Sequence, residues 1–215
     1  MPIAVIADIV GSRRLPDRSE AQRTLDRVIA RAEQDLPLAA SPLRATVGDE
    51  LQARYEELPA ALASLLLVQT ALPDGLELRF GIGVGEIRTV EAEGTDLQDG
   101  PAWWAARTAI ETVHARQQRA VPTTRTWIVG APEEDDAMHT LIDVANAYLL
   151  ARDELVMGMG ERERRLVHGR CLGRTQKQLA EAEGISQSAV SQALAGAGSA
   201  ALVAGFQTLR GRIGA

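Results

Sequence analysis

Two aspartates are the first residues whose type and spacing suggest chemistry. Asp8 follows the apolar run at residues 3–7, and Asp49 lies about forty residues later in the segment TVGDELQ. Two carboxylates with open coordination positions suit Mg²⁺, which takes the rest of its shell from phosphates and water. A lone aspartate at a strand end is usually a turn or cap residue. The pair predicts a metal site formed by Asp8 and Asp49, provided that the fold brings them together.

The segment directly after Asp8 has the composition of a phosphate site. Gly11 and Ser12 follow where a loop enters a helix, so their backbone amides can hold a phosphate. Arg13 and Arg14 add positive charge next to them. These four residues predict nucleotide binding, with Mg²⁺ or Mn²⁺ accompanying the nucleotide. Glu50 is expected to face away from this site, because side chains alternate along a strand.

The elements that must position these residues follow from the periodicity of the first half of the chain. Residues 3–8 predict a short apolar strand, and a helix with Ser19 as its N-cap is expected to run to Leu36. Residues 43–47 and 51–55 predict two strands joined by a two-residue turn at Gly48-Asp49. Residues 58–72 are apolar on most faces, so we expect a buried helix there.

The second half continues the alternation of helix and strand. Residues 76–87 predict a strand whose glycines indicate close approach by a backbone or a ligand. A helix at 100–118, a strand at 124–130 and a long helix at 133–157 follow. The order β-α-β-β-α-β-α-β is that of a ferredoxin-like, split βαβ sheet with additions. The predicted class is therefore α+β, with the first strand and the hairpin side by side in the centre.

A second motif lies in residues 175–194. Its spacing resembles that of the helix-turn-helix of many bacterial regulators. The pattern is T, three residues, L-A, three residues, G-I-S, three residues, V-S, two residues and L. Ser186 would cap the second helix, and Gly184 permits the left-handed turn between the helices. A helical hairpin used only for packing or dimerisation is the alternative. The side chains expected to contact DNA bases or phosphates are Gln187, Ser188, Ser191, Gln192, Thr175, Lys177, Arg170 and Arg174.

The charge of the chain is unevenly distributed. The net charge is −6, but residues 161–215 carry eight Arg or Lys and four Asp or Glu, which leaves −10 for residues 1–160. We therefore predict two domains, an acidic one at 1–157 and a small all-α, helix-turn-helix one at 158–215, with the helix at 133–157 as a stalk between them. Only the second is expected to meet nucleic acid. Such proteins usually bind DNA as dimers, so a homodimer is expected.

The overall composition excludes several classes of protein. Hydrophobic residues make up 46% and charged residues 24% of the chain, as in ordinary globular proteins. Apolar runs such as ALASLLLV are too short to span a bilayer, so we expect a cytoplasmic protein with no membrane partner. Cys171 is the single cysteine, which excludes an internal disulfide and any multi-cysteine metal site.

Several short motifs in order resemble known families. The segments ADIVGSR, VGDE and LRFGIGVGEI resemble the catalytic domain of class III adenylate and guanylate cyclases, and the GDE turn is similar to that of GGDEF diguanylate cyclases. Together with DGPAWWAARTAIE and the helix-turn-helix, they resemble the SatD family over nearly the whole chain. The cyclase resemblance implies that Asp8 and Asp49 hold two metal ions over a triphosphate. It also implies that Arg107 corresponds to the arginine that stabilises the transition state.

Departures from the cyclase pattern weaken the expectation of catalysis. Ala45 stands where cyclases place a base-recognising lysine, and Trp103 stands where they place an asparagine, when the helix is aligned on Arg107. Trp103 is instead a candidate for stacking on a purine. The resemblance thus implies a retained metal and triphosphate platform without the catalytic and base-selecting side chains.

These observations lead to three hypotheses. The first is a DNA-binding transcription regulator whose degenerate cyclase-like domain binds a purine nucleotide or a cyclic mono- or dinucleotide as effector. The second is an active cyclase that converts ATP or GTP to a cyclic nucleotide with two metal ions. In the third, the front domain only dimerises the tail, against which the retention of both aspartates and Arg107 argues.

Overall fold

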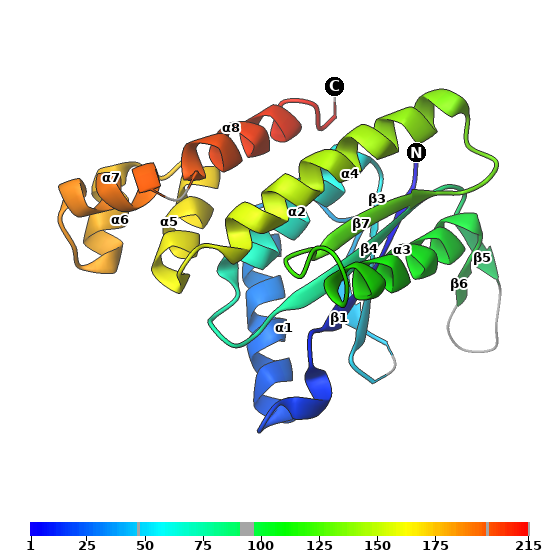
Figure 1. Cartoon of the computed structure of the whole chain (residues 1–215), viewed down its shortest axis with the longest axis horizontal. Coiled ribbons are helices and arrows are strands. Elements are labelled where there is room, and N and C mark those ends of the chain that lie inside the picture. The colour runs from blue at the N-terminus through cyan, green and yellow to red at the C-terminus, as the bar shows by residue number, and fades with distance from the viewer. Residues whose placement is uncertain (47, 91–96, 197, 215) are drawn as a thin grey trace.

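The computed structural model describes residues 1–46, 48–90, 97–196 and 198–214. Figure 1 shows a central sheet flanked by helices, with a group of shorter helices at one end. The strands are β1 (Ile3–Ile9), β2 (Ser41–Ala45), β3 (Glu50–Tyr55), β4 (Leu78–Val84), β5 (Arg88–Val90), β6 (Leu97–Asp99) and β7 (Thr126–Gly130). The helices are η1 (Ser12–Arg14), α1 (Arg18–Asp35), α2 (Leu58–Ala71), α3 (Pro101–Gln117), α4 (Asp136–Met157), α5 (Glu161–Cys171), α6 (Gln176–Glu183), α7 (Gln187–Gly196) and α8 (Ser199–Arg210).

The main sheet has the strand order β2-β3-β1-β4-β7. Strand β1 pairs antiparallel with both β3 and β4, while β7 pairs parallel with β4 at the edge. The units β1-α1-β2 and β3-α2-β4 therefore interleave as a split βαβ sheet, to which β7 is added. The predicted α+β, ferredoxin-like class is confirmed, with β1 and the hairpin strand β3 adjacent in the centre.

Alternation along β1 divides the interior into two layers. Ile3, Val5 and Ala7 pack into the large core under α1 and α2, whereas Ala4 and Ile6 pack under α3. Helix α3 lies so close to β4 that a Cβ on Gly81 or Gly83 would collide with its backbone. The close backbone approach predicted from the glycines of this strand is confirmed.

Helix α2 is buried on all sides. Its residues 60–70 are all buried, which is the expected state of a helix that is apolar all round. One side packs on the sheet core, while α5 and α8 cover the other side. The predicted buried helix is confirmed.

Helix α4, predicted as a stalk between two domains, covers an edge of the sheet. Asn146 accepts a hydrogen bond from the Ile128 amide and donates one to the Ile128 carbonyl, both at 2.9 Å. Asp153 accepts from the amides of Arg125 and Thr126, each at 2.7 Å. These side chains satisfy the outer backbone groups of β7, which would otherwise be an open edge. The role of this helix as a link between two domains stays a prediction, and the structure adds that α4 is packed along β7.

Two of the last four helices, α5 and α8, share a core with the sheet unit. Val167 and Cys171 of α5, with Leu202 and Phe206 of α8, belong to the same buried cluster as the sheet residues. Helices α6 and α7 form a smaller cluster of their own with Leu166. The boundary at residues 157 and 158 stays a prediction, and the structure adds that α5 and α8 are seated on α2.

Smaller differences concern caps and connections. Asp17 rather than Ser19 caps α1, because its carboxylate accepts from the Glu20 amide at 2.9 Å. The connection from β2 to β3 spans residues 46–49, longer than the predicted two-residue turn, and residue 47 lies outside the described residues. The hairpin of β5 and β6 was not predicted. Within the described ranges no single helix could cross a membrane by length and apolarity, and only the bent pair α7 and α8, taken together, meets that test.

Candidate functional site

A cleft of about 590 Å³ lies at the C-terminal end of β1, between η1 and the end of α3. Its volume is within the usual range of ligand sites. It brings together six of the residues predicted to bind a metal or nucleotide, and six residues that were not predicted. The lining residues are Asp8, Ile9, Val10, Gly11, Ser12, Arg13, Arg14, Asp49, Arg79, His114, Gln117 and Gln118.

The Asp8 carboxylate is held by an arginine on the neighbouring strand. Arg79 lies opposite Asp8 in the register of β4, and its Nε and Nη2 atoms donate to the two carboxylate oxygens at 2.7 and 3.0 Å. The Arg79 side chain is 9% exposed and that of Asp8 26%. Bidentate, charge-assisted pairs of this kind are among the stronger polar contacts in proteins. Asp8 is therefore not a free carboxylate.

Glu50, and not Asp49, is the cross-strand neighbour of Asp8. Opposite residues of an antiparallel pair point to the same face of the sheet, so these two carboxylates lie side by side. The prediction that Glu50 faces away was wrong, because β3 begins at Glu50 and places it on the Asp8 face. Arg107 neutralises Glu50 through contacts of 2.7 and 2.9 Å. The Glu50 hydrogen bond is the main reason that the pKa of Arg107 is raised, and the charge of Asp8 adds a smaller contribution.

The residues present do not form a metal site on their own. Within the described ranges, no group of three or more His, Cys, Asp or Glu side chains could hold a metal ion. Asp8 and Asp49 line one cleft, yet both oxygens of Asp8 already accept from Arg79. The metal pair of Asp8 and Asp49 stays a prediction that requires a nucleotide to supply the other ligands.

The loop after β1 has the geometry that its glycine suggested. Gly11 has a φ of 67°, in the left-handed region that favours glycine, and the Arg14 amide donates to its carbonyl at 2.8 Å to begin η1. A Cβ on Gly11 would approach the Arg14 guanidinium to 3.2 Å. Ser12 is buried, while Arg13 and Arg14 are exposed. The loop therefore places two unburied positive charges at the cleft.

The two predicted site residues on α3 do not line the cleft. Trp103 is 8% exposed and packs with Ala4 and Ile6 between α3 and the sheet, which leaves no face open for a purine. Trp104 is 58% exposed and donates to Asp99 at 3.1 Å. Arg107 is closer to the site, since it binds Glu50 beside Asp8.

Sequence reasoning missed Arg79, His114, Gln117 and Gln118. Arg79 Nη1 donates to Gln117 Oε1 at 3.3 Å, and Gln117 Nε2 donates to the Thr124 carbonyl at 2.8 Å. One signal was available: Arg79 is a charged residue inside an otherwise apolar strand, and buried charges are paired. The residues of α3 had no such signal, because the end of an amphipathic helix commonly carries polar side chains.

The second predicted site has the helix-turn-helix geometry. Thr175 and Gln178 form a reciprocal capping box at the start of α6. Gly184 has a φ of 64° at the turn, and the Ser186 hydroxyl accepts from the Ala189 amide at 3.1 Å. Val190 is fully buried. The Ser186 cap and the turn at Gly184 predicted from the sequence are confirmed.

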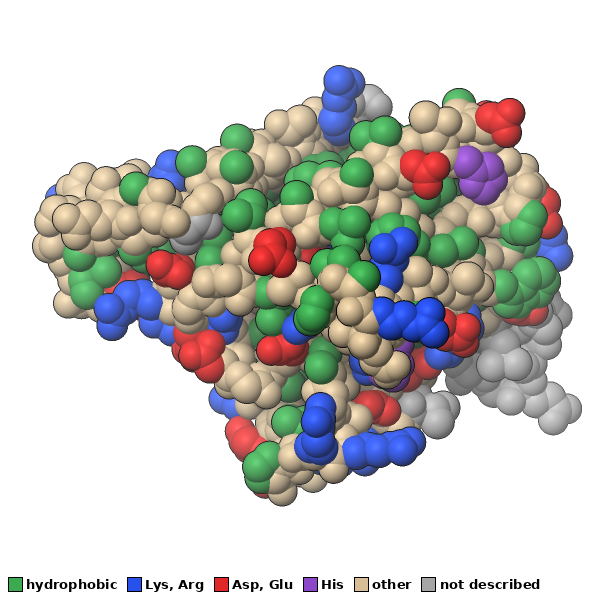
Figure 2. All heavy atoms as spheres, in the orientation of Figure 1, with side chains coloured by type: hydrophobic (Ala, Val, Ile, Leu, Met, Phe, Trp, Pro, Cys, Tyr) green, Lys and Arg blue, Asp and Glu red, His purple; other side chains and the backbone are tan. Residues whose placement is uncertain are grey.

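The outer face of this unit is exposed but weakly charged. Gln187, Ser188, Ser191 and Gln192 are exposed on α7, as are Thr175 and Lys177 by α6, while Arg174 is half-buried. Figure 2 shows mostly uncharged surface at this end of the molecule on the face drawn.

Three arginines of the tail are engaged in contacts within the protein, one with the sheet unit and two within the tail. Arg164 binds Asp74 at 2.7 Å, and Arg165 binds Glu183 at 2.7 Å. Arg170 donates to the Arg174 carbonyl at 2.6 Å. The positive charge of the tail that is available to phosphates is therefore smaller than its composition suggested.

The chain is similar in structure to the adenylyl cyclase CyaB from P. aeruginosa, with 14% sequence identity and a TM-score of 0.38 over 55% of this chain and 81% of that one. No protein with curated annotation matches the sequence. The family model described as the SatD family matches residues 2–204. The chain belongs to the SatD family.

Proposed function

We propose that the protein is a DNA-binding transcription regulator whose cyclase-like unit binds a purine nucleotide, or a cyclic mono- or dinucleotide, as its effector. The observation that carries this proposal is the cleft at the end of β1. It joins backbone amides, three arginines and two aspartates from segments far apart in the chain. The proposal also rests on the exposed polar face of α7 in the same chain.

The charge of the cleft favours an anion. The cleft is lined by three arginines, Arg13, Arg14 and Arg79, and by two carboxylates, Asp8 and Asp49. Arg79 neutralises Asp8. A phosphate near Gly11 would therefore meet Arg13 and Arg14 without strong repulsion from Asp8. Asp49 is the remaining carboxylate, and a divalent cation carried by the phosphates would be expected to lie there. Mg²⁺ or Mn²⁺ enters the proposal only as a companion of the nucleotide.

Binding of nucleotide is tested by thermal shift on the full chain. ATP, GTP, their cyclic monophosphates and cyclic dinucleotides are each added with and without Mg²⁺. A ligand that binds only the folded state raises the melting temperature, by an amount that grows with its concentration. The double variant Arg13→Ala/Arg14→Ala should lose most of that rise, while the matched surface variant Arg18→Ala/Arg23→Ala keeps it. If none of these nucleotides raises the melting temperature, the sensor part of the proposal is wrong.

DNA binding is tested by selecting sequences from a random duplex library with the full chain. In the selected site, Gln187→Ala and Gln192→Ala should each relax the preference at a base position, at a cost of about 1–3 kcal/mol in binding. Lys177→Ala should instead weaken binding to all sequences equally, and the slope of log affinity against log salt concentration should become shallower by about 1. Gln34→Ala, an exposed change on α1, is the matched control. If no sequence is enriched, the DNA-binding part of the proposal is wrong and the tail serves only in packing or dimerisation.

Effector control requires two protomers whose geometry the nucleotide changes. We expect a homodimer, because half-sites on DNA are read by paired recognition helices. The nucleotide would act by binding one dimer geometry better than the other. Sedimentation analysis with and without nucleotide measures the dimer, and DNA titrations with and without nucleotide measure the coupling.

The second candidate is an active nucleotidyl cyclase. It is favoured by the position of Arg107, whose partner Glu50 lies beside Asp8. It is opposed by the Arg79 contact, which occupies the carboxylate that would have to hold metal. Purified protein is incubated with ATP or GTP and either Mg²⁺ or Mn²⁺. A cyclic product that disappears in Asp8→Ala and Arg107→Ala would establish the enzyme, whereas no product under either metal favours the sensor.

A further inference from the structure

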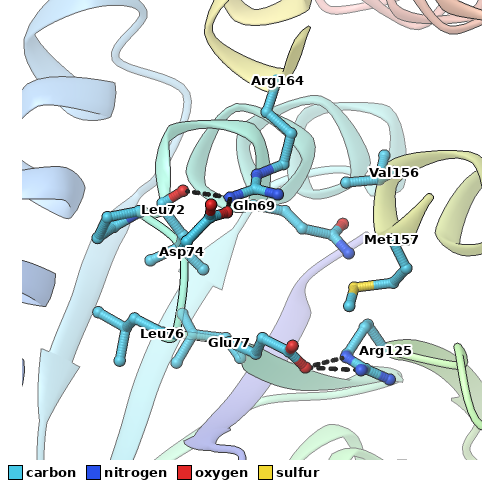
Figure 3. Close-up of a pocket in the computed structure, with 12 residues that line it drawn as sticks. Gln69, Leu72, Asp74, Leu76, Glu77, Arg125, Val156, Met157 and Arg164 are labelled. Carbon is cyan, nitrogen blue, oxygen red and sulfur yellow. Dashed lines mark hydrogen bonds and ion pairs between the residues drawn. The ribbon is translucent and has the colours of Figure 1, made fainter. Parts of the chain in front are cut away.

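A second cavity lies away from the cleft, where the sheet unit meets α5. Its volume is about 60 Å³, and Figure 3 shows that it is bounded by the end of α2, the loop into β4, the start of β7, the end of α4 and α5. The lining residues are Gln69, Leu72, Pro73, Asp74, Gly75, Leu76, Glu77, Leu78, Arg125, Val156, Met157 and Arg164. Neither the nucleotide nor the DNA proposal uses any of them.

Gln69 is a buried polar side chain that points into this cavity. It is 5% exposed, and in the described part of the chain its Nε2 and Oε1 atoms have no hydrogen-bond partner. Figure 3 shows its amide directed from α2 toward the side of the cavity formed by Met157 and Arg125. A buried amide left unpaired is costly, and almost all buried polar side chains in native proteins are paired. Gln69 therefore calls for a partner inside the cavity.

The charges around the cavity cancel in pairs. Arg164 binds Asp74 at 2.7 Å, and Arg125 binds Glu77 at 2.6 Å, both shown in Figure 3. The remaining walls include the apolar side chains of Leu72, Leu76 and Val156. An ion would have to break one of these pairs, because no single charge is left over. The lining favours a neutral molecule that offers Gln69 one donor and one acceptor.

We propose that this cavity binds a small neutral molecule with an amide-type edge, an N–H donor beside a C=O acceptor, which pairs with the Gln69 side chain. By the measure on which one water molecule needs roughly 10–15 Å³, a cavity of about 60 Å³ admits a ligand of only a few heavy atoms. A simple carboxamide carries such an edge and has this size, whereas a pyrimidine base carries the same edge on a larger ring and would require the cavity to widen. Bound there, the ligand would contact α2, α4 and α5 together.

The test uses the full chain and observes the Gln69 side-chain amide and the Met157 methyl group by NMR. Acetamide and propionamide represent free carboxamides, uracil represents a pyrimidine base, and acetate is the charged isostere of acetamide. We expect saturable shifts of both reporters with at least one neutral probe and none with acetate. Saturation by the carboxamides alone would identify a free amide as the ligand class, and saturation by uracil a nucleobase.

Two variants separate this site from a water-filled gap. Gln69→Leu keeps the volume and should weaken binding at least tenfold, measured on the Met157 methyl group. Gln34→Leu, at an exposed position, should leave binding unchanged. The proposal is overturned if no neutral probe shifts either reporter at tens of millimolar, or if Gln69→Leu binds as well as the parent. The probes carry no phosphate, so these results are independent of the nucleotide site.

Discussion

Asp8 lies between Arg79 on one neighbouring strand and Glu50 on the other. Two carboxylates opposite each other in an antiparallel pair would repel, so each needs a cation of its own. Arg79 forms a salt bridge with Asp8, and Arg107 forms one with Glu50. Two ion pairs therefore lie side by side at the centre of the candidate site, with their carboxylates adjacent. Of the two arginines, Arg79 lines the cleft and neutralises Asp8 there.

Arg79→Met should destabilise the protein by about 3 kcal/mol, because it leaves Asp8 beside Glu50 without its buried partner. The loss is expected at the low end of the range for buried pairs, since the Asp8 side chain is 26% exposed. Urea unfolding measures the change. Adding Asp8→Asn to Arg79→Met should recover part of the loss, because the uncompensated charge is removed. If the changes in the free energy of unfolding caused by the two substitutions simply add, the two side chains are not coupled.

At the scale of elements, α3 and α4 are held to the sheet in different ways. Helix α3 approaches β4 closely because Gly81 and Gly83 have no side chains. Helix α4 instead uses Asn146 and Asp153 to bind the outer backbone groups of β7. Helix α3 is positioned by close backbone packing on glycines, and α4 is positioned by hydrogen bonds from its side chains. Both positions matter for the site, because α3 carries Gln117 and β7 is joined to β4.

Gly83→Ala should destabilise the protein by about 3 kcal/mol or more, because the new methyl group collides with the backbone of α3 at Ala102 and Ala106. Backbone atoms cannot move aside as a flexible side chain can. Gly196→Ala in α7, where a Cβ would meet nothing within 4 Å, should leave stability unchanged or slightly raised. Equal effects of the two changes in urea unfolding would contradict the close packing of α3 on β4.

Asp153→Ala should cost about 3–5 kcal/mol, since it leaves Arg152 without its buried ion pair and the amides of Arg125 and Thr126, at the start of β7, without an acceptor. The side chains of Arg152 and Asp153 are both fully buried. Asp143→Ala, an exposed change on the same helix, is the control. A small effect of Asp153→Ala in thermal or urea unfolding would show that α4 is not fastened to the sheet through this residue.

At the scale of the whole molecule, the two proposed ligand sites are linked by consecutive hydrogen bonds. Arg79 in the cleft contacts Gln117, which donates to the Thr124 carbonyl. Arg125 Nη1 donates to the same carbonyl at 3.0 Å and binds Glu77 at the second cavity. Beyond that cavity, α5 leads into the helix-turn-helix. The contacts between the sheet unit and the tail are therefore the part of the molecule on which effector control would depend.

One of those contacts is titratable. His168 of α5 lies against α1 and α2, with its Nδ1 atom 3.1 Å from the Leu67 carbonyl and 3.3 Å from the Thr70 hydroxyl, and Nε2 3.9 Å from Asp35. Burial lowers the pKa of His168 below its usual 6.5, an effect that the Leu67 and Asp35 contacts partly offset, while the nearby charge of Arg174 lowers the pKa further. The imidazole is therefore neutral in the folded protein at pH values where the unfolded chain is already protonated.

The free energy of unfolding should accordingly be undiminished above about pH 6.5 and fall as the pH drops below it, because the unfolded chain then binds more protons. His168→Gln should show a shallower decline between about pH 6.5 and 5. His139→Gln should keep the parent slope. The measurement is urea unfolding at a series of pH values. An unchanged slope in His168→Gln would show that another group causes the acid sensitivity.

Local patterns in the sequence predict the order of the elements, the split βαβ class, the Ser186 cap and the turn of the helix-turn-helix, and the loop from Asp8 to Arg14. These features depend on neighbours within a few residues: periodicity, capping side chains and glycine conformation. The resemblance of short motifs to known families supported the inclusion of Asp49 in the predicted site.

Contacts between distant segments place Glu50 beside Asp8, bind Asp8 to Arg79, bury Trp103 and close the edge of β7 with α4. Each of these contacts joins residues far apart in the chain through strand register and helix packing. A shift of one residue in register reverses the face on which a side chain lies, so no local pattern determines such contacts.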